Sequence, residues 1–297
     1  MELKKPLSFD EQVEKLIEHK MIISDKEAAI NILRKINYYR FTGYALQYRL
    51  KPNDSEYKQN TTFEKVYSIY RFDERLRDIF RRYIEIAEVY YRTCIAYGFS
   101  MTKCMEEPYD QHYSEDNFYY KDGYNEVMES LKKEELHYKD SLIVKHHKAK
   151  YENRMPLWVI VELLSFSHTS KLYNSMYISE KDIIAKSVGI SSKTLSNHLH
   201  CMSVLRNKCA HAARLYNTEF YPPAIFTKQF LAKNPQVNNK SLFAYILILL
   251  KRLPDLQSKR ALITDIVTVI TEFEEDIDFS LIGFPKNFVE LMENNLK

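Results

Sequence analysis

Glycine is scarce in this chain, at five of 297 residues, and this argues against an α/β fold rich in tight turns. Neither a GxGxxG nor a GxxxxGKS/T phosphate-binding loop occurs. The four cysteines form no CxxC pair, so we expect buried, reduced thiols at Cys94, Cys104, Cys201 and Cys209. Cys201, Cys209 and His211 make a poor metal site, because Cys209 and His211 are two residues apart and diverge on a helix.

Long apolar segments are also lacking. The first twelve residues contain no apolar signal segment. The most apolar run, residues 242–250, is too short to span a membrane. We therefore expect a soluble, cytoplasmic protein with no membrane partner.

The residues that are abundant describe a globular protein with a sizeable core. Hydrophobic residues make up 45% and charged residues 28% of the chain, which suits one large domain or two ordinary ones. Tyrosine is common, at 23 residues, alongside 16 phenylalanines. The formal net charge of +3 is compatible with RNA binding.

Helical patterns account for most of the chain, and strand signals are almost absent, so we predict an all-α fold. Capping boxes at Ser8–Glu11 and Thr61–Glu64 begin two helices. From 61 to about 97 neither glycine nor proline interrupts the period, which indicates one long helix or two end to end. The other predicted helices cover about 25–36, a segment ending near 50 after an aromatic turn at 36–44, 124–136, 156–173, 179–186, a helix from 191 or 192, 241–253, 255–274 and a last helix opened by Pro285.

These elements divide the chain into three parts. Residues 1–60 form an N-terminal helical region, and residues 61–233 form a helical core. Residues 98–122, with Pro108 and scattered aromatic side chains, break the helical period and are predicted as a loop inserted in that core. Residues 234–297 form additional C-terminal helices.

One short stretch, Arg206-Asn207-Lys208-Cys209-Ala210-His211, combines residue types suited to phosphate chemistry. It follows a helical pattern, and we place it in the second half of the helix that begins near 191. At 100° per residue Asn207, His211 and Arg214 form one stripe, with Arg206 beside it. Such a face is costly to bury without partners, so we expect a wet cleft or an interface.

This stripe can perform acid–base chemistry on a phosphodiester. A histidine exchanges protons near neutral pH, and an arginine holds a phosphate and stabilises its charge in the transition state. We assign His211 as general base or acid, Arg206 as the phosphate clamp, and Asn207 as the group that orients either one. Candidate RNA contacts or interface residues are Lys208, Arg214 and Asn217. Taken alone, the motif also fits an ordinary solvated helix face.

Three charged residues are candidates for supporting this site. Glu88 and Arg92 are spaced as an i,i+4 ion pair. Glu162 lies in an otherwise apolar helix and needs a partner, for which Arg92 is a candidate. Elsewhere, His146 and His147 lie among lysines in a basic stretch that can contact phosphates, but no carboxylate at a helpful spacing favours a metal there.

Several stretches resemble, in order, the Abi-like (AbiD/AbiF) abortive-infection family of bacterial phage defence. The resemblance covers roughly residues 5–217, and we find nothing similar beyond about 234. The stretches are KPLSFDEQ (5–12), INYYR (36–40) with Gly43 and Tyr44, YRFD (70–73) with Leu76 and Arg77, Glu88 with Arg92, PLW (156–158) with Glu162, Leu163 and Phe166, and RNKCAH (206–211) with RLYN (214–217).

That family is similar to the HEPN superfamily, whose signature is Arg-x4–6-His. The resemblance implies a HEPN-like helical bundle, here with an N-terminal helical extension and additional C-terminal helices. It implies a toxin that is a metal-independent endoribonuclease without a cofactor, similar to the paired nuclease domains of type VI CRISPR effectors. RNA is the implied substrate, DNA is not expected, and a small non-coding RNA is a further candidate partner because some members bind one.

One departure concerns control. HEPN toxins silenced by AMP transfer carry the modified tyrosine two residues after the motif histidine. Here that position is Ala213, and Tyr216 comes three residues too late, so we do not expect this control.

Two copies of the stripe across a two-fold axis would supply two arginines and two histidines to one cleft, so a homodimer is the simplest complete site. A non-catalytic RNA-binding module, or an RNA-bound toxin or antitoxin component, would use the same stripe. A dimer in which the stripe forms only structural hydrogen bonds is a further alternative.

Overall fold

The computed structural model of the chain describes residues 5–52 and 54–296. These residues form fourteen α-helices, four short 3-10 helices and three isolated β-bridges, with no strand among them. The all-α prediction is therefore confirmed. Residues 1–4 of the N-terminal region, residue 53 and the last residue of the C-terminal part lie outside the described residues.

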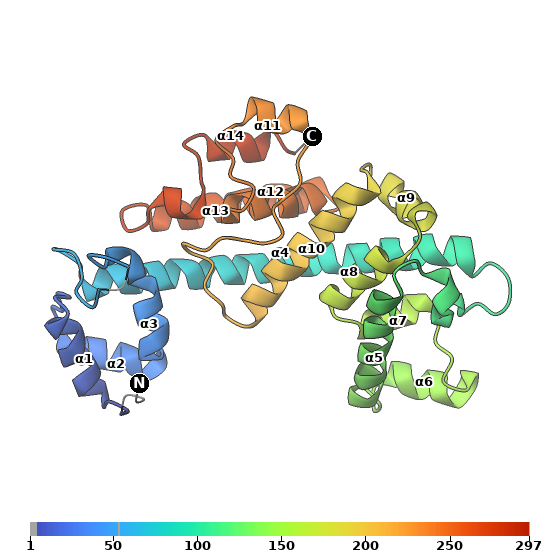
Figure 1. The fold of residues 1–297 in the computed structure, drawn as a ribbon, viewed down its shortest axis with the longest axis horizontal. Helices are drawn as coiled ribbons and strands as arrows, with labels where there is room; N and C mark the ends of the chain where they lie inside the picture. The colour runs from blue at the N-terminus through green and yellow to red at the C-terminus, as the bar shows by residue number, and fades with distance from the viewer. Residues whose placement is uncertain (1–4, 53, 297) are drawn as a thin grey trace.

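Helix α4, Phe63–Lys103, runs through the whole molecule (Figure 1). Its 41 residues correspond to a length of about 60 Å at 1.5 Å per residue. Apolar side chains recur at helical spacing and are buried along its full length, so each group of surrounding helices packs on a different part of it. Of the two predicted alternatives, one continuous helix is observed.

The N-terminal helices lie at the first end of α4 (Figure 1). They are α1 (Phe9–Glu18), α2 (Lys26–Lys35), α3 (Tyr38–Tyr44) and the 3-10 helix η1 (Leu46–Tyr48). The Ser8–Glu11 capping box forms as predicted, and Asp25 caps α2. The aromatic segment predicted as a turn is itself helical, because the Asn37 side chain accepts from Tyr39 N and begins α3 there.

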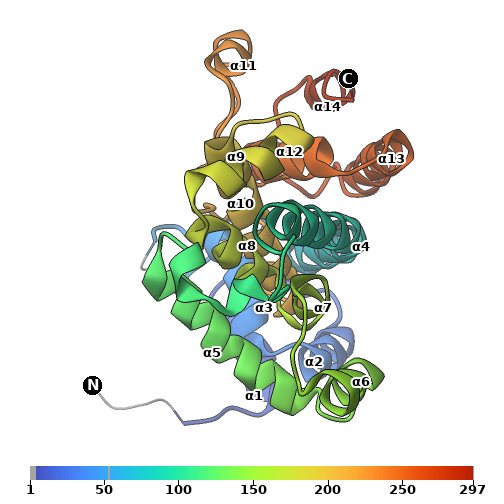
Figure 2. The same cartoon turned by 90° about the vertical axis from the view of Figure 1, so that its right-hand side faces the viewer.

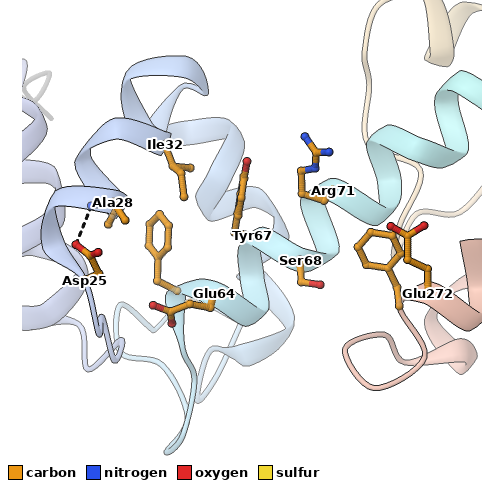
Figure 3. Close-up of a pocket in the computed structure, with 11 residues that line it drawn as sticks. Asp25, Ala28, Ile32, Glu64, Tyr67, Ser68, Arg71 and Glu272 are labelled. Atoms are coloured by element: carbon orange, nitrogen blue, oxygen red, sulfur yellow. Dashed lines mark hydrogen bonds between the residues drawn. The ribbon is translucent and has the colours of Figure 1, made fainter.

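The second predicted capping box is displaced by one residue. Thr62, not Thr61, caps α4 by accepting from Lys65 N, while Glu64 accepts a hydrogen bond from the Ser24 hydroxyl. A pocket of about 340 Å³ remains where α2 and the first turns of α4 approach the end of α13 (Figure 3). It contains none of the predicted site residues.

At the other end of α4 five helices pack together (Figure 1). They are α5 (Lys121–His137), α6 (Leu142–Tyr151), α7 (Leu157–Leu163), α8 (Phe166–Ser175) and α9 (Ile178–Ser187). The predicted loop at 98–122 starts too early, because α4 continues past Gly98 to Lys103. A Cβ at Gly98 would lie 2.4 Å from Ile184 Cγ1, so this glycine serves the close approach of α9 rather than a turn.

This part differs from the prediction in two further ways. Helix α6 is present in a stretch for which no helix was predicted. The single helix predicted over 156–173 is broken: Leu164 is extended, and Ser165 caps α8 by accepting from His168 N. Arg92 on α4 donates a hydrogen bond to the Leu164 carbonyl at this break, with a distance of 2.7 Å. A long-range contact thus satisfies a carbonyl that a continuous helix would have used.

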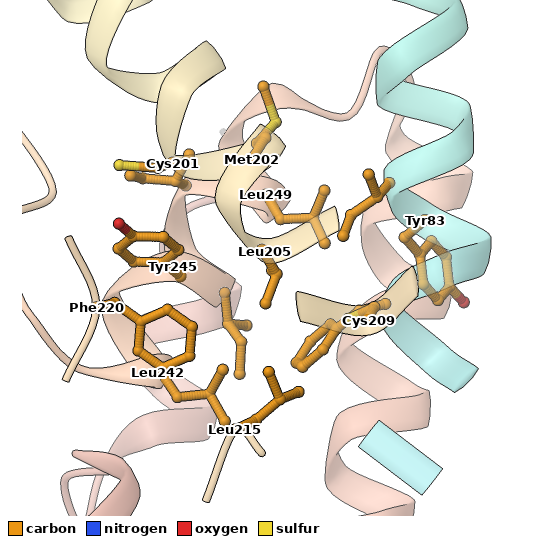
Figure 4. Packing of buried hydrophobic residues seen from close by; sticks show 14 of the residues in the cluster. Tyr83, Cys201, Met202, Leu205, Cys209, Leu215, Phe220, Leu242, Tyr245 and Leu249 are labelled. Carbon is orange, nitrogen blue, oxygen red and sulfur yellow. The ribbon is translucent and has the colours of Figure 1, made fainter. Parts of the chain in front are cut away.

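The last part of the chain completes the core around the long helix. It comprises α10 (Ser192–Ala210), α11 (Lys228–Lys233), α12 (Leu242–Arg252), α13 (Leu256–Glu272) and α14 (Phe288–Glu293), with the 3-10 helix η4 (Phe279–Ile282) before the last. In α12, residues 242–250 are all buried. Figure 4 shows Leu242, Tyr245 and Leu249 facing Cys201, Met202 and Leu205 of α10. The C-terminal helices therefore support the helix that carries the motif.

Viewed nearly along α4, α12 and α13 lie on one side of it and α7 on the other (Figure 2). Within the part of the chain that the structure describes, every helix is too short or too polar to cross a lipid bilayer.

Two buried histidines make the fold sensitive to acid. Burial lowers the pKa of His198 and of His112 to about 4 from the usual 6.5. The unfolded chain binds these protons more readily, so this stability is full above pH 6.5 and is lost as pH falls towards 4. We expect each histidine to lower the unfolding free energy by about 2 kcal/mol at pH 5 relative to pH 8.

The measurement is urea unfolding at both pH values for the parent and for His198→Gln. Glutamine keeps a donor for the Ile225 carbonyl, which lies 2.8 Å from His198 Nε2, but does not titrate. The variant should lose less stability in acid than the parent. An equal loss in both proteins would contradict the assignment.

Candidate functional site

The helix that carries the motif ends sooner than the sequence pattern indicates. Helix α10 ends at Ala210, His211 is its C-terminal capping residue, and Ala212 adopts a left-handed backbone with φ +50°. Arg206 and Asn207 therefore lie in the last helical turn, and His211 is exposed at the helix end. The predicted stripe does not continue to Arg214, which follows the turn.

Three arginines hold the end of α10. Arg81 Nη2 donates to the Cys209 carbonyl at 2.8 Å, and Arg40 Nη1 donates to the Ala212 carbonyl. Arg77 Nη1 lies 3.4 Å from the Ala213 carbonyl. The Cys209 carbonyl, which also accepts from Ala212 N at 3.2 Å, belongs to the last helical turn, and the other two carbonyls lie just beyond it. Cations at a helix C-terminus interact favourably with its dipole. The backbone on both sides of His211 is thereby fixed by α3 and α4.

A buried carboxylate holds the segment that follows. The Asp73 side chain, fully buried on α4, accepts hydrogen bonds from Arg77 Nη1 at 2.5 Å and from the Tyr44 hydroxyl at 2.7 Å. It also accepts from the backbone N–H groups of Leu215 and Tyr216, the latter at 2.8 Å. Since several donors satisfy this carboxylate, the loop after His211 has one defined path.

Arg206 points towards α4. Its Nε lies 3.7 Å from Glu88 Oε2, and 39% of its side chain is exposed. Glu88 also binds Arg92, with 2.6 Å between Arg92 Nη2 and Glu88 Oε1. The contact predicted between Arg92 and Glu162 is present at 3.8 Å. The structure thus joins the three supporting residues and Arg206 in one chain of alternating charges.

Burial and neighbouring charges shift the pKa of Glu88 in opposite directions. Burial raises its pKa above the usual value, while the charges of Arg92 and Arg206 act to lower it. The Arg206 contact is the longer of its two arginine contacts. An incoming phosphate that replaces Glu88 as the partner of Arg206 would leave the Glu88–Arg92 pair intact.

The other predicted site residues, which follow Arg206 in the chain, contact other elements. Asn207 Nδ2 donates to the Ser167 hydroxyl on α8 at 3.0 Å. The Lys208 ammonium lies 5.3 Å from the centre of the Phe220 ring, and burial lowers its pKa. Arg214 donates to the Gly43 carbonyl, and Asn217 lies in the following turn with φ +48°. Lys208 and Arg214 therefore have partners away from Arg206.

A pocket of about 390 Å³ lies between α4 and the end of α10. Its lining includes Arg81, Arg92 and Arg206 together with Glu85 and Glu88. The three arginines outnumber the two glutamates of the lining by one charge, and arginine is well suited to bind a phosphate. Sequence reasoning missed Arg81, although it follows Arg77 by four residues and so lies on the same face of α4.

The prediction of buried thiols is confirmed for Cys104, Cys201 and Cys209 and is wrong for Cys94, which is only partly buried. All four are free thiols, and Cys201 and Cys209 are fully buried whereas His211 is exposed. Burial raises the pKa of both thiols to about 12, so they remain protonated near neutral pH. Across residues 5–52 and 54–296, no group of three His, Cys, Asp or Glu side chains is arranged to hold a metal ion.

Fold and site together define an all-α protein with a cationic pocket beside an exposed histidine. A sequence profile described as "Abi-like protein" matches residues 31–217, more than half of the chain, and runs from the middle of α2 to the end of the motif region. The protein belongs to the Abi-like family, which confirms the resemblance found in its sequence and implies a role in abortive infection, a form of phage defence. Neither curated proteins nor solved structures give a match to this chain.

Proposed function

We propose that the protein is a metal-independent endoribonuclease of the HEPN type that acts in phage defence. One observation carries the proposal: His211 is exposed at the end of α10, the same turn presents Arg206 to a pocket lined by arginines, and arginines from α3 and α4 fix the turn. If the motif were only an ordinary solvated helix face, these arginine contacts to the end of α10 would not be needed.

In the proposed reaction the RNA 2′-OH attacks its own phosphate. A bond forms between the 2′ oxygen and phosphorus, and the bond from phosphorus to the 5′ oxygen of the next nucleotide breaks. A base takes the 2′ proton and an acid gives a proton to the leaving 5′ oxygen, both roles that histidine performs near neutral pH. Arg206 neutralises the charge that develops on the phosphate, and Asn207 orients the reacting groups.

A second copy of the chain is part of this proposal. Arg206 and His211 are five residues apart, so their directions from the α10 axis differ by about 140°. Beside the pocket, Val89, Thr93, Tyr97 and Met101 follow one another at four-residue spacing on α4, and all are exposed. This largely apolar stripe adjoins the pocket because Val89 lines both. A copy packed on it across a two-fold axis would bring a second His211 towards the same phosphate.

The test is incubation of the purified protein with RNA in excess EDTA, followed by analysis of the RNA ends. We expect fragments with 2′,3′-cyclic phosphate and 5′-hydroxyl ends. Cleavage that needs added metal, or other ends, would contradict the mechanism. RNA that stays bound and uncut would instead assign the same cluster to an RNA-binding module.

A further inference from the structure

A second pocket, of about 610 Å³, lies where the end of α6 meets the start of α7. Three of its lining residues are aromatic and unusually accessible: the exposed fractions are 55% for Trp158, 50% for Tyr109 and 45% for Tyr151. Trp158 is the only tryptophan of the chain, and its neighbours Leu157 and Ile160 on α7 are fully buried. The other faces of α7 are therefore packed in the core, whereas the large Trp158 side chain is left exposed to solvent.

Cationic and imidazole groups surround these rings. The Lys150 ammonium lies 5.3 Å from the centre of the Tyr151 ring, and the rings of His146 and His147 lie 5.7 Å and 5.5 Å from it. Helix α6 contains three lysines and two histidines but no acidic residue. Accessible aromatic faces beside cations are the arrangement on which unpaired nucleic-acid bases stack while their phosphates are neutralised.

The wall of the pocket is fixed by an ion pair. Arg154 donates two hydrogen bonds to the Asp110 carboxylate, each 2.7 Å long, which ties the α6–α7 connection to the segment that carries Tyr109. This pair also neutralises one of the two acidic residues in the lining, the other being Glu152. The charge left around the aromatic rings is therefore that of Lys150, Glu152 and the two histidines, next to the lysines of α6.

The second pocket leads towards the first. Trp158 and Glu162 are four residues apart on α7 and both are exposed, so they share one face of the helix within about 6 Å along its axis. Glu162 contacts Arg92, which pairs with Glu88, the partner of Arg206. A chain of ionic contacts thus runs from the exposed face of α7 to Arg206, through Arg92 and Glu88, whose side chains are only 15% and 11% exposed.

We propose that the Trp158 pocket binds an unpaired base of single-stranded RNA whose strand continues along α7 towards Arg206. The inference rests on the proposed function for the identity of the ligand as RNA, and it adds a requirement: the cleaved strand is single-stranded on the α7 side of the cut. Stacking on aromatic rings tolerates any base, so this pocket selects unpaired structure rather than sequence.

The test uses the only tryptophan as reporter. Short 2′-O-methyl oligoadenylate cannot undergo 2′-OH attack, so binding can be followed without cleavage. We expect it to quench Trp158 fluorescence in the full-length protein, and Tyr109→Leu or Tyr151→Leu to weaken binding about ten- to a hundredfold. Tyr39→Leu is the matched control, because Tyr39 is 86% exposed on α3 at the other end of α4. It should bind like the parent.

Fluorescence anisotropy of a labelled oligonucleotide reports binding anywhere on the protein. Binding that leaves Trp158 emission unchanged, or that both pocket variants retain in full, would overturn the inference. Cleavage of unmodified RNA is scored separately by its ends, so the two proposals fail independently. Quenching without cleavage would support the pocket as an RNA site and reject the nuclease. Cleavage without quenching would support the nuclease and reject the pocket as an RNA site.

Discussion

Replacing Arg206 or His211 by alanine is expected to lower the rate of RNA cleavage about a thousandfold and to leave the fold intact. A positioned acid or base contributes about 10²–10⁴-fold, and loss of a group that stabilises transition-state charge has an effect of similar size. His211 is exposed and Arg206 partly so, and removal of Arg206 leaves Glu88 its closer partner Arg92. The measurement is the single-turnover cleavage rate in EDTA, with circular dichroism to confirm folding.

Matched controls are available on the same helix. His200 and Lys193 are both exposed on α10, away from its end, so His200→Ala and Lys193→Ala should cleave at the parent rate. A mixture of the Arg206→Ala and His211→Ala proteins should regain part of the activity if each site draws on two chains. Variants that cut as fast as the parent would reject the assignment, and a mixture that regains nothing would reject the shared site.

Replacing Asp73 by asparagine is expected to lower the free energy of unfolding by about 3–5 kcal/mol, the usual cost of leaving one charge of a buried pair without its partner. Arg77, with only 3% of its side chain exposed, would lose its carboxylate. The amide also cannot accept from as many of the donors that Asp73 now satisfies, which include the N–H groups of Leu215 and Tyr216. Urea unfolding monitored by circular dichroism measures the change.

The control for this prediction is Asp78→Asn. Asp78 also pairs with an arginine of α4, but this pair, with Arg81, is about half exposed. Exposed pairs contribute about 0–1 kcal/mol, so we expect a small change. If the two variants were equally stable, the buried carboxylate would not be the anchor of the loop after His211.

The helices that could be predicted from sequence begin with local signals. Ser8 caps α1 as predicted, and Asp25 and Ser191, each one of two candidates in the sequence, cap α2 and α10. The predicted starts of two later helices, Ser241 and Asp255, are the capping residues of α12 and α13. The break after Leu163 was not, because an arginine on a distant helix takes the Leu164 carbonyl. The end of α10 escaped prediction for the same reason, since Arg40 and Arg81 reach it from far upstream.

In the candidate site too, contacts between residues close in sequence could be predicted, whereas contacts with distant segments could not. The Glu88–Arg92 pair follows from i,i+4 spacing, and the need of Glu162 for a partner led to Arg92. The different directions of Asn207 and Lys208 depend on Ser167 and Phe220, which no local pattern brings near them. Roles in catalysis, RNA contact and dimer formation remain predictions for the experiments above.

The continuity of α4 couples the two halves of the site. Asp73, Arg77 and Arg81 hold the turn after α10, while Glu88 and Arg92 face Arg206 and α7, all from one unbroken helix. Because each residue turns a helix by 100°, one residue inserted between Arg81 and Glu88 would rotate one set of contacts away from the other. The number of residues in this segment is therefore as strict a requirement as their identity.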